Sequence, residues 1–355
     1  DKPDHAMLKP AAECQPIVYP KYYEAIDLGR VAEGRSVGCL SRNGTVAVTR
    51  WRWEQDDNRW HARALRPGGN PEFAFWFVPR YDSWVNGCND NNEFVGVSAG
   101  HGGGVVWDSD WNQGPQRLGS SAVGPNEATA INNARQVVGA GLDSLGNPSA
   151  VAWVAAMPVN STSLTPAVHL APGVATGINA LGVVALTHFV GQPTYRKAGL
   201  VALQGGAPFY PLLPGASVSW ANAIDDQSRI AGGMRDAAGT TRAFTWQMSE
   251  GATTLNPTYD GQGGLSHSDA RSIGLDRTVV GQSYAMLNGQ PVRPAATVWI
   301  HSGTARNLNR EASMADGSAM PLLTNAVAIS HTGAILCEAK DSQGIRRAVL
   351  LRPRS

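Results

Sequence analysis

The segment with the clearest catalytic pattern is residues 96 to 100, where Ser98 lies at the centre of a G-x-S-x-G motif like the nucleophile elbow of α/β-hydrolases. His101 and three glycines follow directly and resemble the oxyanion loop of lipases. A true elbow lifts its serine over a parallel sheet on a strand-to-helix turn, and the oxyanion loop comes from a separate, earlier segment. A hydrolase that uses Ser98 is therefore disfavoured.

A second candidate is a calcium site. Asp108, Asp110 and Asn112 alternate as the oxygen ligands at the start of a calcium loop do. The glutamate that closes such a loop is missing, because Gly119 occupies the twelfth position. A polar turn, in which Asp and Asn bond their own backbone, is the simpler interpretation. The sequence has no zinc-like cluster of His and Cys and no phosphate-binding loop, so no other cofactor is expected.

Both segments lie inside a sequence repeat. In each unit an apolar anchor residue precedes a polar turn and a second strand, as in INNARQVVG from Ile131, and Gly96 is the copy of Gly139, Gly232 and Gly281. Successive anchors lie 43 to 56 residues apart, a period typical of solenoids, propellers or arrays. The seven anchors are Leu40, Cys88, Ile131, Ile178, Ile224, Ile273 and Ile329.

Each unit is predicted to form four short strands, because a third strand such as AFTW and then a fourth follow the second one. Four-stranded units that repeat radially make a β-propeller. The last unit ends without a fourth strand, whereas residues 22 to 30 form a spare strand before the first anchor. The sequence therefore predicts an all-β, seven-bladed β-propeller over residues 22 to 355, closed by the N-terminal strand in the last blade, after an extension over residues 1 to 21.

The pattern I-N-x-x-x-x-V-V-G, then A-F-x-W, then L-G, resembles the HAF repeat family of extracellular bacterial proteins. AINNARQVVG, AIDDQSRIAG, SIGLDRTVVG and RAFTW carry this resemblance, which covers nearly the whole chain. The fourth unit departs from it, with LVAL where tryptophan is expected, and the first unit carries an insertion. The resemblance implies an exported bacterial protein, and it carries no catalytic residues.

If the anchor strand is innermost, the loops between strands two and three, and those that lead to the next unit, gather on one face around the central channel. Aromatic and arginine side chains that converge in such a concavity are typical of a binding site. The residues placed on this face are Arg35, Arg50, Arg52, Trp53, Trp60, Trp84, His101, His188, Tyr195, Arg196, Trp220, Arg235, His267, Arg271, Tyr284 and Arg293.

The first unit contains a long hairpin over residues 49 to 65. Alternation puts Trp51 and Trp53 on one face of it, and residues 54 to 58 are predicted to form the turn. These tryptophans either pack on the neighbouring blade or form a stacking platform for sugar rings or peptide prolines.

Two classes of function fit this sequence. The first is a propeller that binds a glycan or another protein, with ligand-binding candidates Arg52, Trp53, Trp60, Trp84, His101, Arg196, Trp220 and Arg271. The alternative is a polysaccharide lyase that cleaves a uronic-acid polymer by β-elimination, by analogy of architecture alone. Such a lyase needs a cation, a base and an acid. The candidates, in that order of roles, are Arg235 or Arg293, His188 or His267, and Tyr195 or Tyr284.

The four cysteines allow three pairings. Cys39 lies one place before its anchor and Cys88 occupies the next anchor, so alternation lets adjacent blades present them to each other. Cys14 and Cys337 would both belong to the last blade and could reinforce the ring closure. The sequence predicts these two disulfides, with four buried thiols as the alternative.

Composition limits the partners. A net charge of +1 with 16% charged residues gives no electrostatic footprint for nucleic acid or an anionic membrane. No run of about 18 apolar residues exists, so membrane insertion is not expected. The chain starts with DKPDHAMLKPAAEC, as expected after removal of a secretion signal, and a secreted or periplasmic monomer is predicted.

Overall fold

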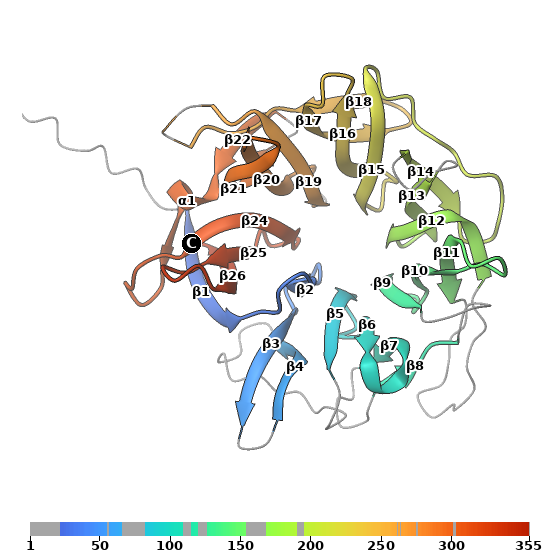
Figure 1. Cartoon of the computed structure of the whole chain (residues 1–355), viewed down its shortest axis with the longest axis horizontal. Helices are drawn as coiled ribbons and strands as arrows, with labels where there is room; N and C mark the ends of the chain where they lie inside the picture. The colour runs from blue at the N-terminus through green and yellow to red at the C-terminus, as the bar shows by residue number, and fades with distance from the viewer. Residues whose placement is uncertain are drawn as a thin grey trace, which may run out of the picture.

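The computed structural model describes residues 22–54, 57–65, 82–108, 115–119, 126–153, 168–189, 195–260, 262, 264–274, 276–300 and 303–354. At residues 50–54, 57–61 and 63–65 it describes strands but not side chains. Its sheets are arranged radially around a common axis (Figure 1). The predicted all-β propeller is therefore confirmed.

Six sheets make up the ring. The first contains β2 (Gly38–Leu40), β3 (Val46–Glu54) and β4 (Asp57–Leu65), and the second contains β5 (Ser83–Cys88), β6 (Phe94–Ser98), β7 (Gly103–Trp107) and β8 (Gln116–Arg117). The third contains β9 (Glu127–Ile131), β10 (Val137–Leu142), β11 (Pro148–Trp153), β12 (Val168–Ile178), β13 (Val183–Phe189) and β14 (Arg196–Ala202). The fourth contains β15 (Ala216–Ile224), β16 (Ile230–Asp236), β17 (Thr241–Gln247) and β18 (Gly251–Leu255). The fifth contains β19 (His267–Ile273), β20 (Val279–Leu287), β21 (Gln290–Ile300) and β22 (Thr304–Asn307). The last contains β24 (Leu322–Ile329), β25 (Ile335–Lys340), β26 (Arg346–Pro353), β1 (Tyr23–Arg30) and β23 (Ala312–Met314).

Helices are short where the chain is described. A 3₁₀ turn, η1 (Ala99–His101), connects β6 to β7, and a single-turn helix, α1 (Leu308–Glu311), follows β22. Among the described residues, no helix is long and apolar enough to cross a membrane.

The prediction of seven separate four-stranded blades is wrong, because the described strands pair into six sheets with three to six strands each. The third and fourth repeat units share the long strand β12. Its residues 168–172 pair with β11 and its residues 173–178 pair with β13, so the outer strand of one unit continues into the inner strand of the next. The change of partner falls at Gly173, whose φ of 126° favours glycine. The seven anchor residues nevertheless end seven inner strands, and all of them line one central cavity.

The predicted ring closure is confirmed. β1 pairs antiparallel with β26 and joins the sheet that contains Ile329 (Figure 1). β23 then adds in parallel to the outer side of β1 through Tyr23 to Ala25, a strand that the repeat pattern did not predict. The first and last parts of the described chain therefore protect each other's edges. The N-terminal extension over residues 1 to 21 lies outside the described residues.

The core lies between neighbouring sheets. One cluster, for example, joins Val95 and Val106 of the second sheet to Val137 and Trp153 of the third. Trp153 is only 2% exposed, and its indole donates a hydrogen bond of 2.8 Å to the carbonyl of Gly119 in the preceding unit. Alternation along each strand thus gives every sheet two apolar faces, as a radial stack requires.

The repeat glycines have a structural role. A Cβ added at Gly96, Gly139, Gly232 or Gly281 would overlap a carbonyl oxygen of the neighbouring inner strand, which is Trp84 O in the case of Gly96. The inner strands shift register opposite these glycines, and this brings the carbonyl close. The glycine of the G-x-S-x-G motif is therefore explained by the close approach of two strands.

One predicted disulfide is confirmed and the other is not. Cys39 in β2 and Cys88 in β5 form a disulfide with their Cα atoms 6.0 Å apart, so it links the first two sheets. Cys337 is a free thiol, and the predicted Cys14–Cys337 bridge is not formed; Cys14 lies outside the described residues. The reason is that the Cys337 side chain packs inside the apolar cluster of the last sheet, where burial raises the pKa of its thiol.

The long hairpin of the first unit is present as β3 and β4. Its strands remain paired as far as Glu54 with Asp57, so the turn is shorter than the predicted five residues. The side chains of Trp51 and Trp53 are outside what the structure describes, and their proposed roles stay predictions.

Candidate functional site

The candidate site is a cavity of about 440 Å³ between the inner strands β12, β15 and β19, which we call the Trp220 cavity. The ends of β13 and β16 and the start of β14 close its sides, so it lies on the face that carries the loops between second and third strands. Four residues from the sequence prediction line it together, namely Arg196, Trp220, Arg235 and Arg271. Thr176, Asn222 and Arg271 also line the central cavity, so the two spaces adjoin.

The indole of Trp220 is held in a defined orientation. Its Nε1 donates a hydrogen bond of 3.1 Å to Asp269 Oδ1. Its six-membered ring packs against the backbone of Gly233 on the neighbouring strand, where an added Cβ would overlap Trp220 Cζ2. One side of the ring is thus supported by Gly233, while the residue as a whole remains partly exposed in the cavity.

Asp269 is the acidic group that organises this wall. Its Oδ1 also accepts a hydrogen bond of 3.1 Å from Asn222 Nδ2, and its Oδ2 lies 3.0 Å from an Arg271 guanidinium nitrogen. Burial raises the pKa of Asp269, while Arg271, Trp220 and Asn222 act in the opposite direction. Because both oxygens have partners, Asp269 positions Trp220 and Arg271 rather than facing a ligand as a free carboxylate.

Three arginines surround the same space. Arg271 is 37% exposed, and its Nε is buried without a hydrogen-bond partner among the described residues. Arg196 lies over the ring of Phe189 at 5.7 Å, and the Arg235 side chain is exposed. A guanidinium group offers up to five N–H donors in a plane, which suits carboxylate and other planar anions. The cavity therefore combines an aromatic wall with a surplus of positive charge.

Trp84 lines a separate cavity of about 480 Å³ at the second and third repeat units, which we call the Trp84 cavity. The guanidinium of Arg35 lies 4.1 Å from the centre of the Trp84 ring. His101 does not line this cavity, although its Nδ1 is 3.1 Å from the hydroxyl of Ser98, which does. Ser98 is 1% exposed and ends β6 before a 3₁₀ turn in an antiparallel sheet, so the geometry of a nucleophile elbow is missing.

Apart from Arg235, the lyase candidates do not line the Trp220 cavity. His188, Arg235 and His267 lie in strands rather than in loops, because β13, β16 and β19 are longer than the repeat suggests. His188 contacts the ring of Tyr210 at 5.0 Å, and its neighbours Thr187 and Phe189 point into the Trp220 cavity instead.

His267 stacks on Tyr284 at 5.2 Å across β19 and β20, and burial lowers the pKa of this histidine. Tyr195 is 45% exposed, and the ammonium of Lys197 lies 5.9 Å from its ring. Arg293 forms an ion pair of 3.0 Å with Asp260.

Some predicted residues cannot be placed. The side chains of Arg52, Trp53 and Trp60, and both Asp110 and Asn112, are outside the described residues. Asp108 is buried and lies 3.2 Å from a guanidinium nitrogen of Arg135, which also pairs with Glu93. Within the described part of the chain, no group of three His, Cys, Asp or Glu side chains could hold a metal ion. Calcium binding remains a prediction.

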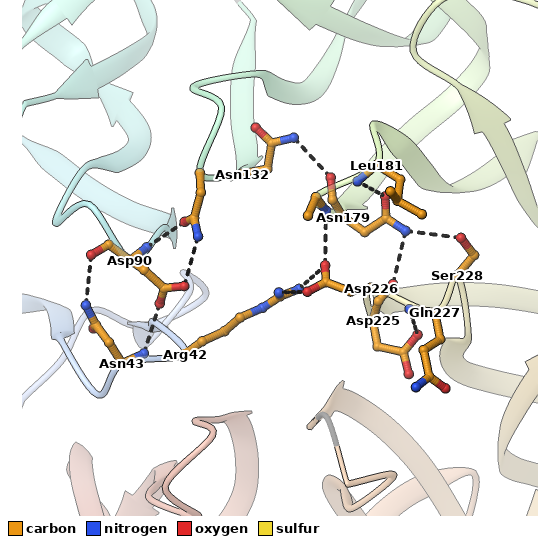
Figure 2. Close-up of polar contacts among 12 residues, drawn as sticks. Arg42, Asn43, Asp90, Asn132, Asn179, Leu181, Asp225, Asp226, Gln227 and Ser228 are labelled. Atoms are coloured by element: carbon orange, nitrogen blue, oxygen red, sulfur yellow. Dashed lines mark hydrogen bonds and ion pairs between the residues drawn. The ribbon is translucent and has the colours of Figure 1, made fainter.

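The opposite end of the channel is built from the turns that follow the anchors. Asn132 and Asn179 each donate their side-chain amide to the backbone carbonyl of the equivalent residue in the next unit, Asn179 and Asp225 respectively (Figure 2). Arg42 reaches across to Asp226, four units away, with one N–O distance of 2.7 Å (Figure 2). These bonds already engage several polar groups at this mouth, whereas the Trp220 cavity on the other face gathers three arginines around an aromatic wall, so we take the Trp220 cavity as the candidate ligand site.

Sequence reasoning missed several residues of the Trp220 cavity, namely Val174, Thr176, Thr187, Phe189, Asn222 and Asp269. Most of them were detectable. Val174, Trp220 and Asp269 all lie four residues before their anchors, and Thr176, Asn222 and Arg271 lie two residues before. Strand alternation turns these positions in one direction, toward the channel face.

Comparison with known proteins supports the fold. No family model and no curated protein matches the chain. It is similar to the β-propeller domain of the Trilobed protease from Pyrococcus furiosus, with a TM-score of 0.55, 8% identity and 94% of each chain covered. It also matches the BP39L lectin from Burkholderia pseudomallei, with a TM-score of 0.43, 13% identity and coverage of 93% and 95%. The match to TolB from Acinetobacter baumannii has a TM-score of 0.41 and 10% identity, and it covers 74% of this chain and 62% of TolB, less than two thirds of its length. The match to the Trilobed protease domain identifies the chain as a β-propeller and nothing finer.

Proposed function

We propose that this chain is an exported binding propeller that recognises a negatively charged carbohydrate in the Trp220 cavity. The observation that carries the proposal is that three arginines line one cavity, while Asp269, the acidic side chain among its described lining residues, is buried and already bonded. A sugar carboxylate would meet guanidinium groups that suit its geometry. Trp220 offers an apolar surface on which a sugar ring can stack.

Export is supported by covalent chemistry. The Cys39–Cys88 disulfide joins two different sheets, and disulfides persist mainly in oxidising compartments. The resemblance of the seven repeat units to the HAF repeat points to the same compartment. We include this family assignment in the proposal.

The first test measures binding of tetragalacturonate and of the neutral cellotetraose by calorimetry. The wild type should bind tetragalacturonate, more weakly as salt is added, and should prefer it to cellotetraose. Replacing Arg235 with Gln should weaken tetragalacturonate binding at least about tenfold, since a hydrogen bond to a charged group contributes about 1.5–3 kcal/mol. The matched control is Arg293→Gln, because Arg293 is also partly exposed but pairs with Asp260 outside the cavity.

The second test displaces Trp220 without removing it. In Gly233→Ala the new Cβ would overlap the indole and lie 2.7 Å from Asp269 Oδ1, so the ring must move. Binding should fall at least as much as in Arg235→Gln. Gly264→Ala is the control, because nothing lies within 4 Å of a Cβ at that position.

Three results would reject the proposal. If wild-type protein binds no uronic-acid polymer in a panel, the ligand is of another class, and a protein ligand becomes the next hypothesis. If the same incubations develop the ultraviolet absorbance of an unsaturated sugar, the protein is a polysaccharide lyase instead. Binding that Arg235→Gln and Gly233→Ala leave unchanged would place the site elsewhere.

A further inference from the structure

The strand that carries Trp220 has a near copy in the second sheet. Residues 83 to 88 read SWVNGC and residues 219 to 224 read SWANAI, so both match Ser-Trp-x-Asn before a small residue and the anchor. Each segment forms an inner strand with a register shift at its asparagine, Asn86 or Asn222. The two copies lie three repeat units apart, on opposite parts of the ring (Figure 1).

The two copies also make the same contacts with the sheet before them. Ser83 Oγ accepts a hydrogen bond of 3.3 Å from the backbone of Ala62, and Ser219 Oγ accepts one of 3.0 Å from the backbone of Ala198. Each segment is then held by a threonine hydroxyl from that preceding sheet, Thr49 in one case and Thr187 in the other.

The contacts with the sheet after them correspond as well. Asn86 Nδ2 lies 2.9 Å from Glu127 Oε1, as Asn222 Nδ2 lies 3.1 Å from Asp269 Oδ1. In both copies the same amide nitrogen also donates to the next backbone carbonyl of that strand, Ala128 O or Ala270 O. Each of the two tryptophans therefore has the same local geometry and lines a cavity, of about 480 Å³ at Trp84 and about 440 Å³ at Trp220.

The two cavities differ in charge and in the state of the indole. Glu127 and Arg35 line the Trp84 cavity, so its charged side chains balance, whereas the Trp220 cavity has three arginines and one aspartate. Trp84 Nε1 is buried and has no hydrogen-bond partner among the described residues, because Glu127 bonds Asn86 instead. A buried donor without a partner is unfavourable, and a ligand oxygen would satisfy it.

We propose that the Trp84 cavity is a second binding site, which takes an uncharged sugar residue. The sugar ring packs on Trp84, and a sugar oxygen accepts the hydrogen bond of Trp84 Nε1. Arg35 is an exposed side chain that covers one face of the ring, and the ligand displaces it. This proposal takes from the proposed function that the ligand is a carbohydrate, and it does not depend on the charge of the ligand in the Trp220 cavity.

The test observes the indole directly. Protein labelled with ¹⁵N at tryptophan is titrated with cellotetraose, chitotetraose and mannotetraose in separate experiments, and the Trp84 and Trp220 signals are assigned from Trp84→Phe and Trp220→Phe. At least one neutral sugar should shift the Trp84 Nε1–H signal downfield in a saturable way, because this proton gains an acceptor. The Trp220 signal should not move with that sugar.

Variants complete the test. Trp84→Phe should lose the neutral sugar while Trp220→Phe, the matched control, should retain it. Arg35→Ala should bind it about two- to fivefold more tightly, the range expected when an exposed cation–π contact no longer competes. The proposal is overturned if none of the three sugars shifts the Trp84 signal selectively, if Trp84→Phe binds like the wild type, or if only tetragalacturonate shifts that signal. A failure of tetragalacturonate to bind at Trp220 would reject the proposed function and leave this result standing.

Discussion

Reducing the Cys39–Cys88 disulfide should destabilise the protein by about 4 kcal/mol. The bridge closes a loop with a sequence separation of 49 residues. For a loop of that length the chain-entropy relation gives a loss of about 14 cal/mol/K in the unfolded state, which is about 4 kcal/mol at 25 °C. This corresponds to a change of about a thousandfold in the folding equilibrium.

The structure also locates the effect. Cys39 belongs to β2, a three-residue strand in the three-stranded first sheet, and the bridge fixes that strand to β5 of the second sheet. Cys39 and Phe94 share one apolar cluster, so the interface itself persists without the covalent bond. Loss of the bridge should therefore increase hydrogen exchange most strongly in β2 and β3.

The assay is urea unfolding followed by tryptophan fluorescence, with and without a phosphine reductant. The double variant Cys39→Ala/Cys88→Ala is the control, and reductant should not change its stability. Cys337 should stay unlabelled by iodoacetamide in the folded state, because it is buried. A stability change below about 1 kcal/mol in fully reduced wild type would refute the chain-entropy argument, and four free thiols in folded, unreduced protein would refute the bridge itself.

Three further predictions concern the ring, the serine and the histidine. Deletion of residues 1 to 30 removes β1 and exposes the edge of β26, so it should lower the melting temperature markedly; a truncated protein that melts like the parent would contradict the role of β1. Ser98 should not react with a fluorophosphonate probe, because it is 1% exposed; labelling that disappears in Ser98→Ala would reverse this conclusion. Burial lowers the pKa of His188 below 6.5, so the unfolded state binds more protons and stability should fall as pH drops from about 6.5 toward the folded pKa. Between about pH 7.5 and about pH 5.5, the melting temperature of His188→Gln should therefore fall less than that of the wild type. The same fall in both proteins would show that His188 is not the cause.

The sequence predicted the framework well because the framework repeats. The anchors recur in all seven units and the repeat glycines in four of them, so their spacing is visible in one chain. The closing strand β1 was visible because the last unit lacks a fourth strand and a spare one precedes the first anchor. The sequence did not predict that two units share β12, because this depends on one strand continuing past Gly173, and the repeat pattern contains no signal for that. The burial of Cys337 depends in the same way on packing and not on spacing.

The candidate sites were only partly predictable, and the reason is physical. Residues such as His188 were assigned to the channel face by their distance from an anchor, but a longer β13 turns His188 toward Tyr210 and its neighbours Thr187 and Phe189 into the cavity. A shift of one residue along a strand turns a side chain to the opposite face of the sheet. The ends of strands are the least certain part of any sequence-based assignment. A residue that is predicted to lie in a loop beside a strand end is therefore easily misplaced.

Positions fixed from the anchor do not have this weakness. The residue four places before each anchor lies within an inner strand, except for Ser36, which precedes β2, and its chemistry differs from unit to unit. These residues are Ser36, Trp84, Glu127, Val174, Trp220, Asp269 and Asn325. Because this position holds a tryptophan, a carboxylate or an aliphatic residue in different units, the propeller fold does not determine which residue stands there. The two tryptophans are each followed, in the next unit, by an acid at the same position, and both pairs line cavities. This repeated pairing of an acid with a tryptophan is the feature that the two proposed binding sites share.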